Sequence, residues 1–302
     1  MARACGKMIA LGGLKVKLRV PSGVLNISSE QHYGSPKVVA RLAVDDNLGV
    51  TVSSYMHPSE NMLVTNVTAG AAAVTVSLST WAVSSDASPA SATVGNNGSV
   101  GTVTRRAMSN SLPHTKNIIA ALASSSLAVR QWQETSDEAG PAAKAELAIA
   151  ANQTVSIYTA FADNALSNSN AVAVTAAAVS AARRAVTTAD TAVAVADART
   201  QFWNEFWSRS AISLPSSPAV ERYWYDANYI TASMAPSNPE LPPPGLYGPW
   251  VTTDNPAFGG DYTFDYNYEA SFYVRGILCR LAYCSWHHIE AFVEQLASSR
   301  TF

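Results

Sequence analysis

The sequence predicts an antiparallel β-sandwich followed by helices, and this prediction rests on three observations. Up to about residue 165 the chain consists of short β-rich runs separated by Gly, Pro, Asn and Ser, at the roughly 8–12-residue spacing that is typical of a sandwich. From residue 169 to about 199 the composition changes to Ala, Val and Thr, and Ala is the strongest intrinsic helix former. Beyond residue 200 lie five of the seven Trp, nine of the twelve Tyr and seven of the eight Phe.

The first section contains ten expected strands. Residues 44–50 combine acidic residues with Asn and Gly, which predicts a hairpin turn. The stretch 84–101 is rich in Ser, Ala, Gly and Asn, so we expect a long surface loop with Gly95, Gly98 and Gly101 as turn residues. The expected strands are residues 14–20, 24–27, 37–43, 49–54, 62–68, 73–79, 100–105, 118–123, 146–149 and 154–160.

Helices are expected in the rest of the chain. The Ala-rich segment continues into a run in which Phe202 and Phe206, like Trp203 and Trp207, are four residues apart and share a helix face. Residues 219–234 have helical periodicity, the Pro-rich residues 236–244 interrupt it, and a last helix is expected over about 268–293. The predicted domains are a β-sandwich over 1–165, a linker helix over 166–210 and a helical domain over 211–302.

Charge and composition exclude several classes of protein. The 302 residues carry 20 Lys and Arg against 22 Asp and Glu, a net charge of −2, and only 14% of the residues are charged. A nucleic-acid-binding protein needs a basic face, so we expect no nucleic-acid partner. No apolar run approaches the ~18–20 residues that cross a bilayer, so we expect no membrane insertion.

The sequence leaves the cellular compartment of the protein open. Three cysteines cannot all pair with one another, so no disulfide framework is expected. Four Asn-x-Ser/Thr sequons, at Asn26, Asn66, Asn97 and Asn152, are either glycan acceptors or chance matches in a Ser/Thr-rich chain. Residues 1–14 lack a clear signal peptide. Either the protein is cytosolic or the true N-terminus is lost, and a signal peptide on that terminus would favour secretion.

Several catalytic and metal signatures are absent from the sequence. It contains no Gly-x-Ser-x-Gly elbow, Walker loop or Gly-x-Gly-x-x-Gly motif. His287 and His288 are adjacent and would diverge by about 100° on a helix, while Cys284 supplies only one further ligand. We therefore expect neither a metal ion nor another cofactor.

Residues 243–269 carry the most informative pattern. Planar rings pack against the C–H faces of sugars, while carboxylates and amides bind the hydroxyl groups. In an extended segment, Asp265, Asn267 and Glu269 would project to one side. The alternative is a helix-capping turn with packed aromatic rings. This Gly/Pro-shaped stretch displays Tyr247, Trp250, Tyr262 and Tyr266 among Asp254, Asn255, Asp261, Asp265, Asn267 and Glu269.

An ordered series of motifs runs through residues 200–275. A Trp-x-x-Phe-Trp-like pattern at 203–207 is followed by Ser-x-x-x-Leu-Pro at 210–215 and Glu-Arg-Tyr-Trp-Tyr at 221–225. Pro-x-Gly-Leu-x-Gly-x-Trp then occupies 243–250, and Gly-Asp-Tyr at 260–262 leads to Asp-Tyr-Asn at 265–267. This series resembles the start of the catalytic domain in glycoside hydrolase family 95 and its fucosidase-like relatives, whereas residues 1–165 match only in architecture.

The resemblance implies a fold and an activity. The family has an N-terminal β-sandwich, a helical linker and an (α/α)6 barrel, of which this chain would hold only the first helices, an incomplete toroid. The implied reaction is inverting hydrolysis of α-linked sugars such as fucosides or galactosides. In it, Asp265 and Asn267 orient the attacking water. The sugar pocket is expected to involve Trp250 and Asp261, with Asp254, Tyr262 and Glu269 as further substrate-binding residues.

Two departures from the family limit this expectation. The family's Asn-x-Asn pair is replaced by Asp265-Tyr266-Asn267, and an Asp there could itself act as a base. The family's general acid lies far downstream, and inverting hydrolysis needs two carboxyl groups about 6.5–9.5 Å apart. We therefore expect the chain as given to be truncated and inactive, by nature or through its gene model. The alternative is a non-catalytic carbohydrate-binding or structural remnant of such an enzyme.

Overall fold

The structure is a computed structural model. It describes residues 10–18, 25–44, 48–57, 60–86, 88–95, 98–107, 118–137, 140–164, 169–187, 191–209, 211–234 and 254. The chain divides into two compact units. One unit is Leu11–Trp203, and the other combines Met1–Ala10 with Asn204–Phe302.

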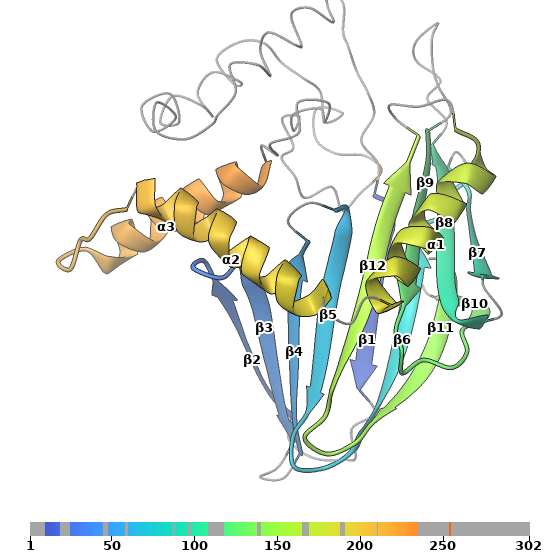
Figure 1. Cartoon of the computed structure of the whole chain (residues 1–302), viewed down its shortest axis with the longest axis horizontal. Helices are drawn as coiled ribbons and strands as arrows, with labels where there is room; N and C mark the ends of the chain where they lie inside the picture. Colours follow the sequence, from blue (N-terminus) through green and yellow to red (C-terminus); the bar gives the residue numbers. More distant parts are fainter. Residues whose placement is uncertain are drawn as a thin grey trace, which may run out of the picture. The chain divides into compact units, whose positions relative to one another are not determined.

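The unit Leu11–Trp203 is built on two antiparallel sheets, which confirms the predicted β-sandwich (Figure 1). One sheet has four strands in the order β1 (Gly12–Leu18), β6 (Val74–Ala82), β11 (Gly140–Ile149) and β10 (Gln133–Asp137). The other has eight, in the order β2 (Leu25–His32), β3 (Lys37–Val44), β4 (Leu48–Met56), β5 (Met62–Ala69), β12 (Thr154–Asp163), β9 (Ile118–Ser125), β8 (Val100–Ala107) and β7 (Ala90–Gly95).

The main core lies between the two sheets. In β6 the side chains of Val74, Val76 and Leu78 are buried, while Thr75 and Ser77 between them are only half-buried. This period of two follows from the pleat, which sends successive side chains to opposite faces. The same cluster contains Val50, Val67, Val129, Trp132, Leu147, Ile149 and Ile157.

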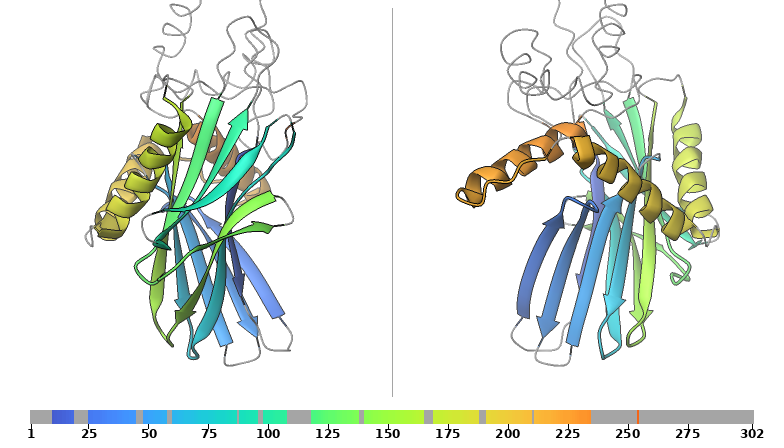
Figure 2. Two further views of the ribbon diagram at one scale, coloured as in Figure 1. Left: turned by 90° about the vertical axis from the view of Figure 1, so that its right-hand side faces the viewer. Right: turned by 60° about the vertical axis from the view of Figure 1, so that its left-hand side comes forward.

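Helix α1 (Ala171–Thr187) covers the outer face of the eight-stranded sheet, where it contacts β8, β9 and β12 (Figure 2). Its buried residues are Val174, Ala178, Ala182 and Ala185, a narrow stripe of small side chains that lets the helix lie close to the sheet. Asn170 caps the helix, because its Oδ1 accepts a hydrogen bond from the N–H of Ala173 at 3.0 Å.

Where a single linker helix was expected over 166–210, the structure has two helices, α1 and α2 (Thr191–Arg209). The helix expected over 219–234 is present as α3 (Pro218–Met234). The domain boundaries 1–165, 166–210 and 211–302 stay a prediction. Within the described part of the chain, no helix combines the length and the apolar character that crossing a bilayer requires.

The expected surface loop over 84–101 is wrong, because it contains strand β7, which pairs with β8 along its length. Ala90 and Ala92 pack against a small core of Ala82, Val103 and Leu122. Side chains this small fill a shallow space between two sheets, so the stretch lacks the bulky residues that usually reveal a strand. Gly95 and Gly101 also lie in strands, β7 and β8, rather than in turns.

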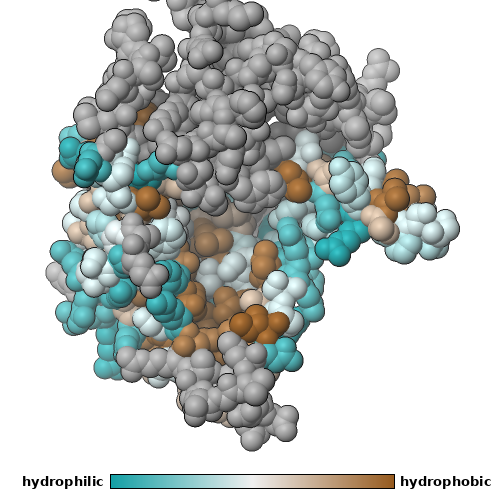
Figure 3. All heavy atoms as spheres, turned by 180° about the vertical axis from the view of Figure 1, so that it is seen from behind, coloured by the Kyte–Doolittle hydropathy of each residue, from teal (hydrophilic) through white to brown (hydrophobic). Residues whose placement is uncertain are grey.

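An apolar surface remains at one end of the eight-stranded sheet. The strand register places Ile27, Val38 and Met56 on the face that carries the core residue Val50. Their exposed fractions are 59%, 46% and 58%. Seen from behind, apolar side chains gather in a hollow on this side (Figure 3). The well-packed core therefore reaches β4, and beyond it the inner faces of β2 and β3 are open.

Candidate functional site

The predicted sugar site lies almost wholly outside the described residues. Asp265, Asn267, Trp250, Asp261, Tyr262 and Glu269 belong to that part of the chain, as do Cys284, His287 and His288. Only Asp254 is described, as a half-buried residue in a bend. The assignment of these residues therefore stays a prediction. Among the residues that the structure describes, no three His, Cys, Asp or Glu side chains are grouped so that they could hold a metal ion.

Two of the motifs that precede this predicted site contact each other. The ring of Trp207, near the end of α2, lies 6.5 Å from the ring of Trp224 and 5.3 Å from that of Tyr225, both in α3. Trp224 and Tyr225 meet edge to face at 4.9 Å, an arrangement that the ring quadrupoles favour. The aromatic residues at 203–207 and 221–225 thus include a cluster that joins two helices.

The short segment between these helices is tied to α3. The N–H of Leu214 donates to Oε2 of Glu221 at 2.5 Å, and the hydroxyl of Tyr225 donates to the carbonyl of Ile212 at 3.0 Å. Pro218 occupies the first turn of α3, where its missing N–H costs nothing. This segment is therefore a structural element that orients α3, and none of these groups forms an open site.

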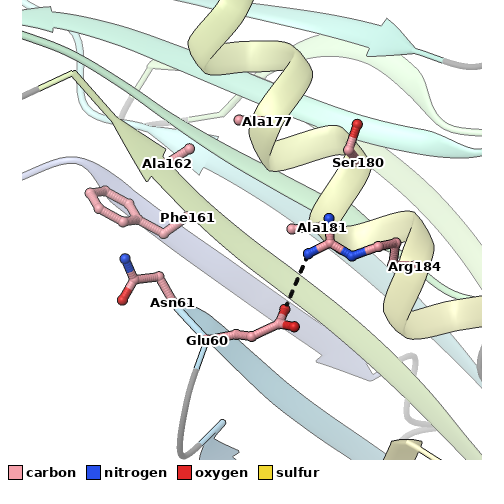
Figure 4. Close-up of a pocket in the computed structure, with 8 residues that line it drawn as sticks. All are labelled: Glu60, Asn61, Phe161, Ala162, Ala177, Ser180, Ala181 and Arg184. Atoms are coloured by element: carbon pink, nitrogen blue, oxygen red, sulfur yellow. Dashed lines mark ion pairs between the residues drawn. The ribbon is translucent and has the colours of Figure 1, made fainter. Parts of the chain in front are cut away.

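A groove of about 400 Å³ lies on the sandwich unit (Figure 4). An ion pair crosses it, because Nη2 of Arg184 lies 3.7 Å from Oε2 of Glu60. We call it the α1–β12 groove. Its lining comes from the turn before β5, from β12 and from α1: Glu60, Asn61, Phe161, Ala162, Ala177, Ser180, Ala181 and Arg184.

The turn before β5 holds one side of this groove in place. The N–H of Glu60 donates to Nδ1 of His57 at 3.0 Å, and the N–H of Met62 donates to the carbonyl of Glu60 at 2.8 Å. The N–H of Phe161 donates to the carbonyl of Asn61 at 2.8 Å, which joins the turn to β12. Burial lowers the pKa of His57, while the nearby Glu60 carboxylate acts in the opposite direction.

A second polar cluster lies on the same sheet face but is packed rather than open. The guanidinium of Arg199 in α2 stacks 4.0 Å from the ring centre of Tyr55, and Arg199 is only 7% exposed. Burial raises the pKa of Tyr55, whereas Arg199 and a hydrogen bond with Asn66 act to lower it. The hydroxyl of Ser156 donates to Oδ1 of Asn66 at 2.8 Å. This cluster anchors α2 to the sheet.

The sequence analysis did not find the α1–β12 groove. Glu60 and Arg184 are 124 positions apart, and neither belongs to a motif with a known spacing. The only signal was the Arg183-Arg184 pair in the predicted linker helix, and a charged pair on a helix usually faces solvent. The groove follows from the packing of α1 on β12.

Comparison with known proteins gives a fold but no family. No protein-family model matches the chain, and no curated protein matches its sequence. Among solved structures, the chain is similar to a protein from the human microbiome that is assigned as a kojibiose phosphorylase, with a TM-score of 0.58 and 12% sequence identity. The match covers 82% of this chain but 34% of that one, so the chain spans about a third of that protein's length.

Two further similarities are weaker. A family GH92 alpha-mannosidase from Bacteroides thetaiotaomicron matches with a TM-score of 0.44 and 10% identity, over 74% of this chain and 32% of that chain. Heparinase III matches with a TM-score of 0.30 and 16% identity, over 50% of this chain and 23% of that chain. The similarity to the kojibiose phosphorylase shows a shared fold.

Proposed function

We propose that this chain is the N-terminal part of an enzyme that acts on α-linked sugars. The observation that carries the proposal is the fold similarity to a kojibiose phosphorylase over 82% of the chain. The order of elements, a β-sandwich, linker helices and the first helix of a helical section, also agrees with the architecture that the family resemblance implies. A chain built in this order would use its sandwich as a scaffold and its helical section for chemistry.

The proposed sugar site is the segment 243–269. Asp265 and Asn267 would orient the attacking nucleophile, Trp250 would stack on the sugar ring, and Asp261 would bind hydroxyl groups. Asp254, Tyr262 and Glu269 would complete the substrate contacts. The contact between α2 and α3 supports this proposal, because two of the aromatic motifs that precede the segment pack against each other.

The reaction can be hydrolysis or phosphorolysis. The family 95 resemblance favours inverting hydrolysis of fucosides or galactosides. The name of the structural neighbour favours phosphorolysis, in which inorganic phosphate takes the place of water. A non-catalytic carbohydrate-binding role is the remaining candidate. Hydrolysis and phosphorolysis differ in their products, and the non-catalytic role gives binding without a product, so product analysis and a binding measurement together separate the three.

The test combines turnover with binding. The protein is incubated with aryl α-fucosides, aryl α-galactosides and kojibiose, with and without inorganic phosphate, and the products are separated by chromatography. Sugar binding is followed by NMR titration with fucose, galactose and kojibiose. We expect a Kd on the order of millimolar, which corresponds to a binding free energy of about 4 kcal/mol. Trp250→Ala should remove the sugar-induced shifts of residues 243–269, and Asp265→Asn should remove any turnover.

Each outcome identifies one candidate. Free sugar without phosphate consumption indicates hydrolysis, and sugar phosphate indicates phosphorolysis. Shifts of residues 243–269 that Trp250→Ala removes, without turnover, indicate the non-catalytic role. Wild-type protein that shows neither turnover nor sugar-induced shifts of residues 243–269 would overturn the proposal, as would shifts of these residues that are unchanged in Trp250→Ala.

A further inference from the structure

We propose that the α1–β12 groove is an accessory binding site for one neutral sugar ring, separate from the proposed site at 243–269. The groove is formed wholly within the sandwich unit by the turn before β5, by β12 and by α1. The choice of a sugar over other polyols rests on the proposed function. The choice of an uncharged, hydroxyl-rich ligand rests on the groove itself.

The charges in the groove favour a neutral ligand. Among the described residues that line the groove, the charged ones are Glu60 and Arg184, and they carry opposite charges 3.7 Å apart. A phosphate that approached Arg184 would meet the Glu60 carboxylate, and an ammonium group would meet the guanidinium. A pair of neighbouring hydroxyl groups can instead donate to the carboxylate and accept from the guanidinium at the same time.

The shape of the groove fits a flat ring. Ala162, Ala177 and Ala181 contribute only methyl groups, so the wall between β12 and α1 has no protruding side chain (Figure 4). The C–H face of a pyranose could lie on such a wall, with the hydroxyl of Ser180 and the amide of Asn61 near its edge. The volume of about 400 Å³ lies near the lower end of the range of roughly 300–1,000 Å³ for small-molecule sites.

The exposed ion pair is available to a ligand. The side chains of Glu60 and Arg184 are 41% and 66% exposed, and an ion pair at such an exposure contributes little to the stability of a fold. Opening the pair to admit hydroxyl groups therefore costs little. The backbone of the turn is held by the bonds of Glu60 to His57 and Met62, so the carboxylate stays near its place when the pair opens.

The test is an NMR titration of the complete 302-residue chain with glucose, kojibiose and, separately, inorganic phosphate. The expected result is a millimolar Kd for the sugars, with shifts at the amides of Asn61, Ser180 and Ala181, and no such shifts with phosphate. Arg184→Ala should raise the Kd about tenfold, because it removes charge-assisted hydrogen bonds. Ala177→Trp should abolish binding by filling the groove, and Ala177 is exposed, so this variant should fold.

Arg183→Ala is the matched control, because Arg183 is an exposed residue of the same type, next in sequence and absent from the lining. It should leave the Kd within about twofold of the wild-type value. Trp250→Ala and Asp265→Asn should leave the groove shifts unchanged, so a failure of the site at 243–269 would be distinguishable from a failure of the groove. Absence of sugar shifts at the three amides, phosphate binding there, or shifts that survive Ala177→Trp would overturn the proposal.

Discussion

Replacement of Gly101 by Ala tests the packing between the two sheets. A Cβ atom at this position in β8 would lie 2.3 Å from Cε3 and 2.6 Å from Cδ2 of Trp132, and 2.9 Å from Cβ of Ala143. Contacts this short force the indole to move. Trp132 is 1% exposed and belongs to the main core. Its backbone N–H donates a hydrogen bond to the carbonyl of Gly98 at 2.8 Å. The indole therefore has little freedom to move away from a new Cβ.

The expected cost follows from two opposing effects. Overpacking a core typically lowers the free energy of unfolding by about 1–3 kcal/mol. Replacing Gly by Ala within a strand raises it by roughly 0.5–1 kcal/mol. Because all three contacts are shorter than 3.0 Å, we expect the upper part of the overpacking range, about 2–3 kcal/mol. The free energy of unfolding should therefore fall by about 1–2.5 kcal/mol in Gly101→Ala. For a unit of this size, about 2–4 °C per kcal/mol corresponds to a Tm lower by roughly 2–10 °C.

Circular dichroism during urea and thermal unfolding measures both quantities without relying on tryptophan emission. Gly49→Ala is the control, because nothing lies within 4 Å of a Cβ at that position in β4. The double variant Gly101→Ala/Trp132→Phe should lose less stability than the sum of the two single variants, with a coupling of about 0.5–3 kcal/mol. Equal Tm values for Gly101→Ala and Gly49→Ala, or strict additivity in the double variant, would refute the reasoning.

Two further predictions concern ionisable groups. Arg199→Met should lower the free energy of unfolding by about 0.5–2 kcal/mol, because the stacked cation is lost, and should raise the pKa of Tyr55 further. Ultraviolet titration measures the pKa of Tyr55, with Arg183→Met as the control. An unchanged Tyr55 titration midpoint in Arg199→Met would contradict the prediction. His57 should titrate by NMR below its ordinary pKa of about 6.5. Because the fold lowers this pKa, the contribution of His57 to stability is complete above pH ~6.5 and is lost as the pH falls through the pKa of His57 in the folded protein. His57→Asn should weaken this loss of stability in acid. A titration midpoint of His57 at or above 6.5 would show that burial does not lower its pKa.

The strands that could be predicted from the sequence are those whose side chains are large or β-branched. Residues 37–43, 62–68 and 154–160 were expected as strands, and β3, β5 and β12 lie there. Strand β7 was not predicted because its inward-facing residues include Ala90 and Ala92, and small side chains produce little hydrophobic periodicity in the sequence. Gly101 was assigned to a turn for a related reason, since local sequence does not show that an indole ring 31 positions away occupies the space of its side chain.

One of the two candidate sites could be predicted from local sequence, and the other could not. The predicted residues at 250–269 come from a local motif, and a motif within some twenty residues can be recognised without knowing the fold. Glu60 and Arg184 meet only because α1 packs across β12 and the turn before β5. The sequence by itself determined the order of sandwich, linker helices and α3, since the period of hydrophobic residues and the helix propensity are local properties. Tertiary structure alone decided the eight-to-four division of the strands, the open face of β2 and β3, and the α1–β12 groove, because each depends on contacts between residues far apart in the chain.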